Sequence, residues 1–410
     1  MFLLSAIGTA MVATSVIGIH RNMPNTHMKI VVRRYLEANK LEAIKISSLT
    51  REGDLFKMKL ILPYNITAAE FQKHVPGIEQ VTYSHIRFSY QGGPAVYLEF
   101  GYSEFKARMP FKMTKLDPLC IPLFSPFGIR HLDFRQETSC HVMIGGATRM
   151  GKTALIRLMA TMLLHTTNGN VKMKMLDNKV NDLYMFKNIP QVEIGETADD
   201  AARILTDVLQ EVADRKRVLK EYDDCIDIHE LRQKHPDRDF PPLFIIIDEY
   251  GRYADDETVQ QAVEALVETA GYLDVHIILA SQRPDAQTVL KARIKANLTT
   301  RICFSTTDEA NSKVVLDLPD AAKLYKVQGR AILLDGFPEV VQVPHLTTAA
   351  AVELLKPFVK EKVQDELTEG RKDYSNVEPL QSFEPLPIGE DSLPEPKKRN
   401  RNRKPGVKKT

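Results

Sequence analysis

Hydrophobic residues between positions 140 and 346 occur in short apolar runs that alternate with longer segments of helical periodicity. Apolar runs of this length, interleaved with helices, are typical of a parallel β-sheet that is covered by helices on both faces. The pattern therefore predicts an α/β fold with a mostly parallel sheet. The predicted strands are His141–Ile144, Met173–Leu176, Leu243–Ile247, His276–Ala280, Arg301–Phe304 and Ala331–Leu334.

The part of the chain before this region has a mixed pattern, which predicts a small α+β domain over residues 23–117. It has no recognisable chemical signature. A stretch with three prolines then leads into the larger domain, predicted over residues 118–350. The small domain is expected to contain helices at Val31–Ala43 and Ala68–His74 and strands at Asp54–Pro63, Ile86–Tyr90 and Ala95–Phe100.

The first residues form an uncharged run of 18 residues, Phe2–Ile19. This length is just enough for a transmembrane helix, so residues 1–22 are predicted to be a membrane segment. The nearest cations follow the run, which favours an orientation that leaves the rest of the chain at the cytoplasmic face. A secretory signal peptide and a buried N-terminal helix are the alternatives.

The C-terminal part is predicted to contain a helix over residues 351–372 and a disordered, Pro-rich and basic tail over residues 373–410. The last 14 residues carry eight cations and no acid. The whole chain has 55 Lys+Arg against 53 Asp+Glu, and without these 14 residues the balance is 47 against 53. Net charge is therefore close to zero overall, which argues against a nucleic-acid coat protein but not against local contacts with DNA.

The composition is that of an ordinary globular protein, with 43% hydrophobic and 26% charged residues. It excludes wholesale disorder, collagen and a polytopic membrane protein. The four cysteines lie far apart without a Cys-x-x-Cys pair, and the histidines show no ligand spacing. No metal cage is therefore predicted, and the cysteines are expected to be reduced.

The strongest chemical signal is the segment GATRMGKT at residues 146–153, between a predicted strand and a predicted helix. It matches the G-x-x-x-x-G-K-[ST] phosphate loop in the required context. Its glycines allow the backbone to wrap phosphates, and the helix that follows adds its positive N-terminal end. Lys152 is expected to reach the β- and γ-phosphates of ATP, and the Thr153 hydroxyl to bind Mg²⁺.

A second element, PPLFIIIDEY at residues 241–250, is a hydrophobic strand that ends in two carboxylates. Asp248 is expected to hold Mg²⁺, and Glu249 to act as general base on the attacking water. Adjacent acids at this place are also common at helix N-termini, but together with the phosphate loop they indicate a nucleotide hydrolase. The predicted nucleotide and metal contacts are Gly146, Ala147, Thr148, Arg149, Met150, Gly151, Lys152, Thr153 and Asp248.

A third element, HIILASQRP at residues 276–284, is another apolar strand that ends in polar groups. Gln282 is expected beside Glu249, where its amide could sense the γ-phosphate or hold the water. The alternative is a glutamine satisfied within its own loop. Arg283 precedes a proline and is interpreted as structural.

Together with LKARIKANLTTRICFSTTDEANSKVVLD at residues 290–317 and MLDNKVNDLYMFKNIP at residues 175–190, these motifs resemble the FtsK/SpoIIIE family of DNA-pumping motors. The resemblance covers roughly residues 140–346. It implies a RecA-like phosphate-loop core that assembles into a hexameric ring, binds ATP between subunits and threads DNA through the central channel. It also implies Mg²⁺ as a cofactor and DNA as a partner that is bound without recognition of its sequence.

Two departures from the family pattern matter. Gly271 stands where family members usually carry an arginine that acts on the neighbouring subunit's ATP. Either Arg301 or Arg293 is therefore expected to take that role, or hydrolysis is expected to be slow. No winged-helix module follows the motor core. A short membrane segment with one motor core resembles the FtsK-type coupling proteins of Gram-positive conjugative elements, which implies a relaxase and transfer-channel proteins as partners.

Lys291, Arg293 and Lys295 alternate in a segment that could contact DNA phosphates, or form a solvated helix face. The function expected is ATP-dependent DNA translocation at the membrane. The alternatives are a soluble segregation or packaging motor, a secretion ATPase that acts on protein, and a scaffold that binds ATP without efficient turnover.

Overall fold

The computed structural model describes residues 25–360, apart from residues 53–54, 102–108, 112–115, 137–139, 178–182, 239, 254, 282–290 and 325. The predicted membrane segment, Gln282, the basic tail and residues 361–372 of the predicted C-terminal helix lie outside these ranges. Within them, no helix combines the length and the apolar character needed to cross a bilayer.

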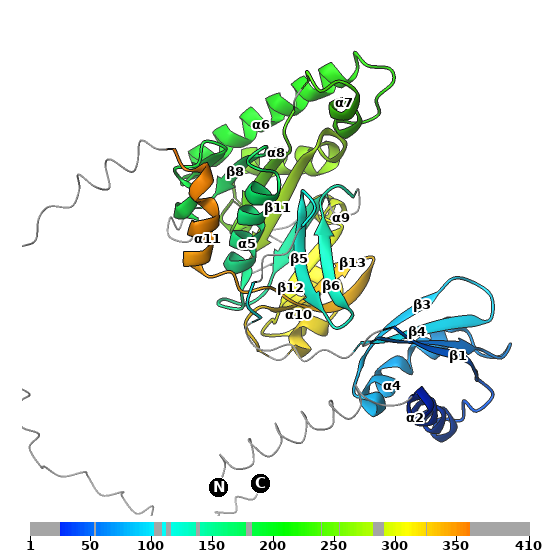
Figure 1. Ribbon diagram of the computed structural model, residues 1–410. Coiled ribbons are helices and arrows are strands. Elements are labelled where there is room, and N and C mark those ends of the chain that lie inside the picture. Colours follow the sequence, from blue (N-terminus) through cyan, green and yellow to red (C-terminus); the bar gives the residue numbers. More distant parts are fainter. Residues whose placement is uncertain are drawn as a thin grey trace, which may run out of the picture. The chain divides into compact units, whose positions relative to one another are not determined.

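The N-terminal part contains a four-stranded antiparallel sheet with the strand order β1-β2-β4-β3. Alternate residues of β2 and β4, such as Phe56 and Leu98, are buried together with the apolar residues of three helices. One face of the sheet thus packs against helices (Figure 1). The elements are α2 (Asn25–Ala38), β1 (Lys45–Glu52), β2 (Leu55–Ile61), α3 (Ala68–Gln72), α4 (Val75–Thr82), β3 (His85–Tyr90) and β4 (Ala95–Gly101).

The strands and the short helix predicted for this part are confirmed as β2, β3, β4 and α3. The bounds of the first helix were wrong, because α2 begins six residues earlier than predicted and ends five residues earlier. Two elements were missed. Strand β1 has one buried residue, Leu49, and so lacks the expected alternation, and α4 carries Pro76 and Gly77, which are poor helix formers in general, although Pro is tolerated in the first turn.

A ten-stranded sheet forms the core of residues 120–342, with the order β6-β5-β14-β13-β12-β7-β11-β10-β8-β9. The six strands from β12 to β9 pair in parallel, and the other pairings are antiparallel. The strands are β5 (Cys120–Ser125), β6 (Gly128–Asp133), β7 (His141–Gly145), β8 (Lys172–Leu176), β9 (Val192–Gly195), β10 (Leu243–Ile247), β11 (Val275–Ser281), β12 (Thr300–Phe304), β13 (Arg330–Asp335) and β14 (Phe337–Gln342).

Helices cover both faces of this sheet, as the inner strand β10 shows. Phe244 and Ile246 join a core cluster that includes α5, whereas Leu243, Ile245 and Ile247 join a cluster that includes α6 and α8. Burial on both faces explains why the strands are continuous apolar runs. The helices are α5 (Lys152–Thr166), α6 (Ala198–Leu219), α7 (Ile228–Lys234), α8 (Glu257–Thr269), α9 (Ala292–Asn297), α10 (Glu309–Leu316) and α11 (Thr348–Leu355).

The prediction of an α/β fold with a mostly parallel sheet is confirmed, with one difference in direction. The apolar run Ala331–Leu334 forms β13, which pairs antiparallel with β12 and continues into a hairpin with β14 around Gly336, whose φ is +80°. The Pro-rich stretch also contains a strand that was missed. Strand β5 tolerates Pro122 because its pairing with β14 is confined to Phe124, so no ladder bond toward β14 is lost at the proline.

Candidate nucleotide-binding and hydrolysis site

The phosphate loop lies at the carboxyl end of β7 and leads directly into α5. Gly146 and Gly151 have φ values of +134° and +125°, which favour glycine. A methyl group on Gly146 would lie 2.6 Å from Cβ of Phe304 on the neighbouring strand β12. The loop is also tied to the chain after β12, since Ala147 N–H donates to the Ser305 carbonyl oxygen at 3.0 Å. The loop is therefore packed too closely against the strand for a larger residue.

The Lys152 ammonium lies across this loop, on a side chain that is almost fully buried. Its Nζ donates to the carbonyl oxygens of Gly146 and Ala147, the latter at 3.0 Å. Behind it, burial raises the pKa of the Cys303 thiol to about 12, an effect that the nearby Lys152 partly opposes. The thiol is therefore neutral at physiological pH, and Lys152 provides positive charge at the loop.

These features fit the phosphates of a nucleotide. The loop backbone can approach a phosphate closely because its two glycines carry no side chains. The N-terminal end of α5 favours an anion, and the Lys152 side chain is already directed toward the loop. Thr153 is the second residue of α5 and half-buried. Its hydroxyl and the carboxylate of Asp248 are oxygen ligands of the kind that Mg²⁺ prefers.

The two predicted carboxylates follow β10 at the same edge of the sheet as the phosphate loop. Strand β11 lies between β7 and β10, with Gly145 paired to Ser281 and Ile247 paired to Leu279. Asp248 is 6% exposed, and its backbone N–H donates to the Leu176 carbonyl oxygen at 3.2 Å. The structure thus brings the phosphate loop and the acids to one sheet edge.

Ser281 is a residue of this edge that the sequence analysis missed. It is the last residue of β11, it is buried, and its Oγ donates to Oε1 of Glu249 at 3.2 Å. The hydroxyl fixes the orientation of the carboxylate predicted to act as general base. A serine at the end of an otherwise apolar strand, one residue before Gln282, was the available signal.

Asp177 is a second missed residue. It follows β8 directly, is 3% exposed, and its N–H donates to the Gly195 carbonyl oxygen at 3.1 Å. Because β8 pairs with β10 in parallel, Asp177 lies at the same sheet edge as Asp248. The structure therefore places a second buried carboxyl group beside the predicted metal ligand.

Arg301 lies at the opposite, amino edge of the sheet, as the second residue of β12. Its guanidinium donates to the carbonyl oxygens of Leu298 and Lys295 at 2.9 and 3.1 Å and forms an ion pair with Asp317. It is therefore remote from the phosphate loop of its own chain. If Arg301 acts on ATP, it would have to act on the ATP of a neighbouring subunit.

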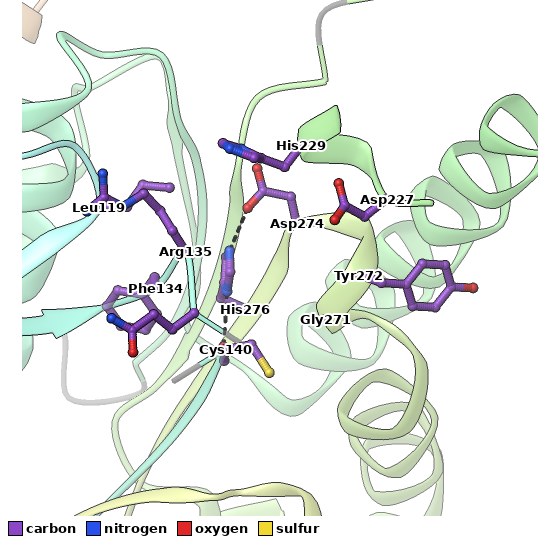
Figure 2. A pocket seen from close by; sticks show the side chains of 11 residues that line it. Leu119, Phe134, Arg135, Cys140, Asp227, His229, Gly271, Tyr272, Asp274 and His276 are labelled. Atoms are coloured by element: carbon purple, nitrogen blue, oxygen red, sulfur yellow. Dashed lines mark hydrogen bonds and ion pairs between the residues drawn. The ribbon is translucent and has the colours of Figure 1, made fainter. Parts of the chain in front are cut away.

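Gly271 also lies at the amino edge, just before β11, where it borders a cavity of about 230 Å³ (Figure 2). The ring of His276 bridges the carboxylate of Asp274 at 2.8 Å and the carbonyl oxygen of Cys140 at 3.0 Å. A methyl group on Gly271 would meet the Cys140 sulfur at 3.2 Å. The position therefore has little room for a side chain in its present packing.

The three cations near α9 are partly neutralised. Lys291 and Arg293 both contact the carboxylate of Glu264, at 3.4 and 3.6 Å, and Lys295 pairs with Asp317 at 2.6 Å. Arg293 remains 76% exposed. Of these three side chains it is the most accessible for a phosphate contact.

Comparison with known proteins agrees with the sequence motifs. The model of the FtsK/SpoIIIE family matches residues 106–320, more than half of the chain. The DNA translocase FtsK of Listeria monocytogenes is 28% identical over 197 residues, which are 45% of this chain and 26% of that protein. The chain thus matches about a quarter of the length of this relative.

Solved structures with a similar fold include the pCW3 conjugation coupling protein TcpA in its monomer form with ATPγS. That match has a TM-score of 0.57 at 18% identity and covers 80% of this chain and 99% of the other. The cytoplasmic domain of the type VII secretion ATPase EccC from Thermomonospora curvata matches with a TM-score of 0.53 at 18% identity, over 63% of this chain and 33% of the other. At this identity, both matches concern the fold alone.

Proposed function

Because the chain belongs to the FtsK/SpoIIIE family, we propose that it is an ATPase that moves DNA, and that the sheet edge described above is its hydrolytic site. The observation that carries this proposal is the contact between Ser281 and Glu249, beside the phosphate loop and the buried Asp248. A general base held in place next to a phosphate loop is the arrangement that nucleotide hydrolysis requires.

ATP with its Mg²⁺ supplies the phosphoanhydride bond and the charge that polarises it. The chain supplies the backbone N–H groups of the loop, the N-terminal end of α5 and the Lys152 ammonium for the phosphates. Thr153 and Asp248 are the residues that would hold the metal. Glu249 accepts the proton of the attacking water on a carboxylate oxygen, while the Ser281 hydroxyl keeps the carboxylate oriented.

We propose further that the motor works as a homo-hexameric ring in which each amino edge faces the ATP of the next subunit. Support comes from the position of Arg301 at that edge, away from its own phosphate loop. Arg301→Lys would retain the charge but lose the fork of donors that a trans-acting arginine uses. The test mixes Arg301→Lys subunits with Glu249→Gln subunits. If Arg301 acts in trans, a Glu249→Gln subunit can supply its arginine to an Arg301→Lys neighbour that retains Glu249, so mixed rings should recover hydrolysis. If Arg301 acts in cis or is structural, mixed rings should stay inactive.

The proposed substrate is DNA, bound without sequence recognition. Phosphate contacts by cations such as the exposed Arg293 would give binding that weakens steeply with salt. Displacement of a triplex-forming strand from duplex DNA, driven by ATP, would test translocation directly. Arg293→Gln should lower the salt dependence of DNA binding, and Lys323→Gln is a matched surface control outside α9, since Lys323 is 63% exposed. Equal behaviour of both variants would remove Arg293 from the DNA contact.

We also propose that the motor couples DNA to a conjugative transfer channel at the cytoplasmic face of the membrane, with a relaxase and channel proteins as partners. The apolar run Phe2–Ile19 and the single motor core support this proposal. Fractionation of the full chain and of a chain starting at Met23 tests the anchor. Equal recovery of both in the soluble fraction would favour a soluble segregation or packaging motor. Stimulation of hydrolysis by polypeptide rather than DNA would favour a secretion ATPase.

A further inference from the structure

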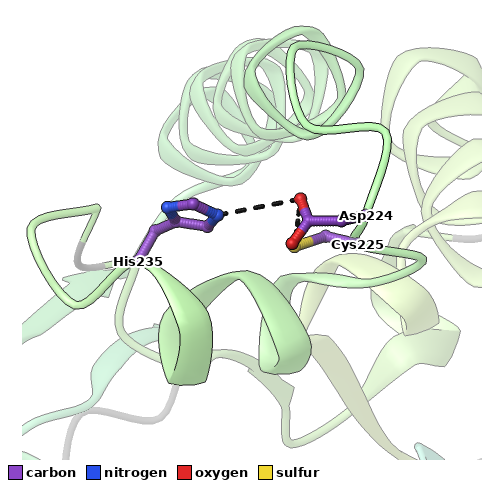
Figure 3. A group of neighbouring side chains, drawn as sticks. All are labelled: Asp224, Cys225 and His235. Atoms are coloured by element: carbon purple, nitrogen blue, oxygen red, sulfur yellow. Dashed lines mark hydrogen bonds and ion pairs between the residues drawn. The ribbon is translucent and has the colours of Figure 1, made fainter.

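The segment between α6 and α7 brings together three side chains that are not part of the nucleotide site. Asp224 and Cys225 lie just before α7, and His235 is the residue at which α7 ends. The side chains from the two ends of this short helix face one another across a short gap (Figure 3). They come from both ends of α7, so anything bound between them would hold both ends together.

The ligand atoms have the spacing of a small coordination site. Oδ1 of Asp224 lies 3.8 Å from Nε2 of His235 and 3.7 Å from Sγ of Cys225. One potential ligand atom from each residue lies within 4.8 Å of the others. A tetrahedral zinc ion with bonds of about 2.0–2.3 Å separates its ligands by roughly 3.3–3.8 Å. Two of the distances are therefore already at the upper end of the range that zinc needs.

The state of His235 is a second, independent observation. Its Nε2 atom is buried and has no hydrogen-bond partner among the residues that the structure describes. The ring packs against that of Tyr222 in a tilted arrangement, with the centroids 4.4 Å apart and the planes at 49°. A buried ring nitrogen without a hydrogen bond is uncommon, and here it faces a thiol and a carboxylate.

One cation lies close to this cluster. The Lys234 ammonium contacts the Asp224 carbonyl oxygen and lies 3.7 Å from Oδ2 of the same residue, and 3.8 Å from a Glu230 carboxylate oxygen. The ammonium is therefore associated with the other carboxylate oxygen, Oδ2. Oδ1, the atom that faces His235 and Cys225, remains directed into the gap.

We propose that Asp224, Cys225 and His235 bind a divalent transition metal, with Zn²⁺ as the ion that fits best. Thiolate, imidazole and carboxylate together are characteristic zinc ligands, and water would complete the tetrahedron. Binding converts the Cys225 thiol to a thiolate bonded to the metal and releases its proton to solvent. The ion replaces the weak contact between the thiol and Asp224.

A metal here would stabilise α7 and what α7 supports. Arg232 of this helix pairs with Asp274 of the amino-edge cavity, and Asp227 and His229 also border that cavity. The site would therefore order one wall of the cavity. No sequence pattern predicts this site, because nine residues separate Cys225 from His235 and the spacing matches no familiar zinc motif.

The test uses the full chain without nucleotide, dialysed against Zn²⁺, with bound metal measured by atomic spectrometry and Co²⁺ used as a spectroscopic probe. We expect one metal ion per chain and thiolate-to-cobalt charge-transfer absorption. His235→Gln and Cys225→Ser should each weaken Zn²⁺ binding at least about tenfold. His229→Gln on the same helix and Cys140→Ser are the matched controls and should bind as wild type does.

Cys225 is buried, so Cys225→Ser could fail to fold, whereas Asp224 and His235 are more accessible. Asp224→Asn and His235→Gln therefore decide the outcome if the cysteine variant is lost, with circular dichroism as the check of folding. The proposal is overturned if wild type binds no stoichiometric Zn²⁺, or if folded Asp224→Asn and His235→Gln bind it as tightly as wild type. Neither result would bear on the ATPase, because the cluster is separate from the phosphate loop.

Discussion

The contact between Ser281 and Glu249 allows a sharp test of the hydrolytic site. Ser281→Ala removes one hydrogen bond, 3.2 Å long, to the carboxylate proposed as general base. A hydrogen bond to a charged group contributes about 1.5–3 kcal/mol to the stability of the arrangement that it holds. Since about 1.36 kcal/mol corresponds to a tenfold change in rate, kcat for ATP hydrolysis should fall roughly 10- to 100-fold. KM for ATP should stay within about twofold, because Ser281 contacts the base rather than the phosphate loop.

The assay is steady-state release of phosphate over a range of ATP concentrations, with Ser305→Ala as matched control. Ser305 is also a buried serine, and it follows β12 at the same sheet edge, one strand beyond β7, but its hydroxyl donates to the Leu324 carbonyl oxygen. Alanine there keeps the backbone contact with Ala147. In the Glu249→Gln background, Ser281→Ala should add little further loss. An unchanged kcat in Ser281→Ala, or an equal fall in Ser305→Ala, would refute the assigned role.

Three further predictions concern the loop and the core. Gly146→Ala should lower ATP affinity at least about tenfold by calorimetry, because the methyl group would meet Phe304 at 2.6 Å in a backbone conformation that disfavours alanine; wild-type affinity would contradict this. Arg215→Met should lower the free energy of unfolding in urea by about 3–5 kcal/mol, because the fully buried guanidinium pairs with Glu211 at 2.7 Å and donates to the carbonyl oxygens of Leu273 and Pro241; a loss below about 1 kcal/mol would contradict this. Burial lowers the pKa of His141 to about 3, so below pH ~6.5 the unfolded chain takes up a proton that the folded chain does not. Wild type should therefore lose about 2 kcal/mol more than His141→Asn between pH 7 and pH 5, and parallel curves would refute this.

The sequence predicted the central strands and the phosphate loop well for a physical reason. Strands buried on both faces must be apolar throughout, and a phosphate loop needs glycines and a lysine at fixed positions. The direction of β13 could not be predicted, since an apolar run carries no sign of whether its neighbour is parallel. Strand β5 was not predicted because Pro122 argues against a strand unless the pairing partners of that strand are known.

The candidate site was predicted in part. The position of Asp248 and Glu249 at the sheet edge could be predicted because they follow an apolar strand, whereas the positions of Ser281 and Asp177 beside them depend on which strands are neighbours. The cluster of Asp224, Cys225 and His235 forms because α7 brings residues from its two ends together, and no local sequence pattern predicts this. The chemical roles of the site residues, including Gln282 and a trans-acting Arg301, stay predictions.

The most direct test of the central claim is the rate of ATP hydrolysis by the full chain with and without duplex DNA. A DNA-moving ATPase predicts that DNA raises the rate of wild type, and that Lys152→Ala and Glu249→Gln abolish both the basal and the stimulated activity. A wild-type rate that DNA leaves unchanged, or equal activity in all three proteins, would contradict the account.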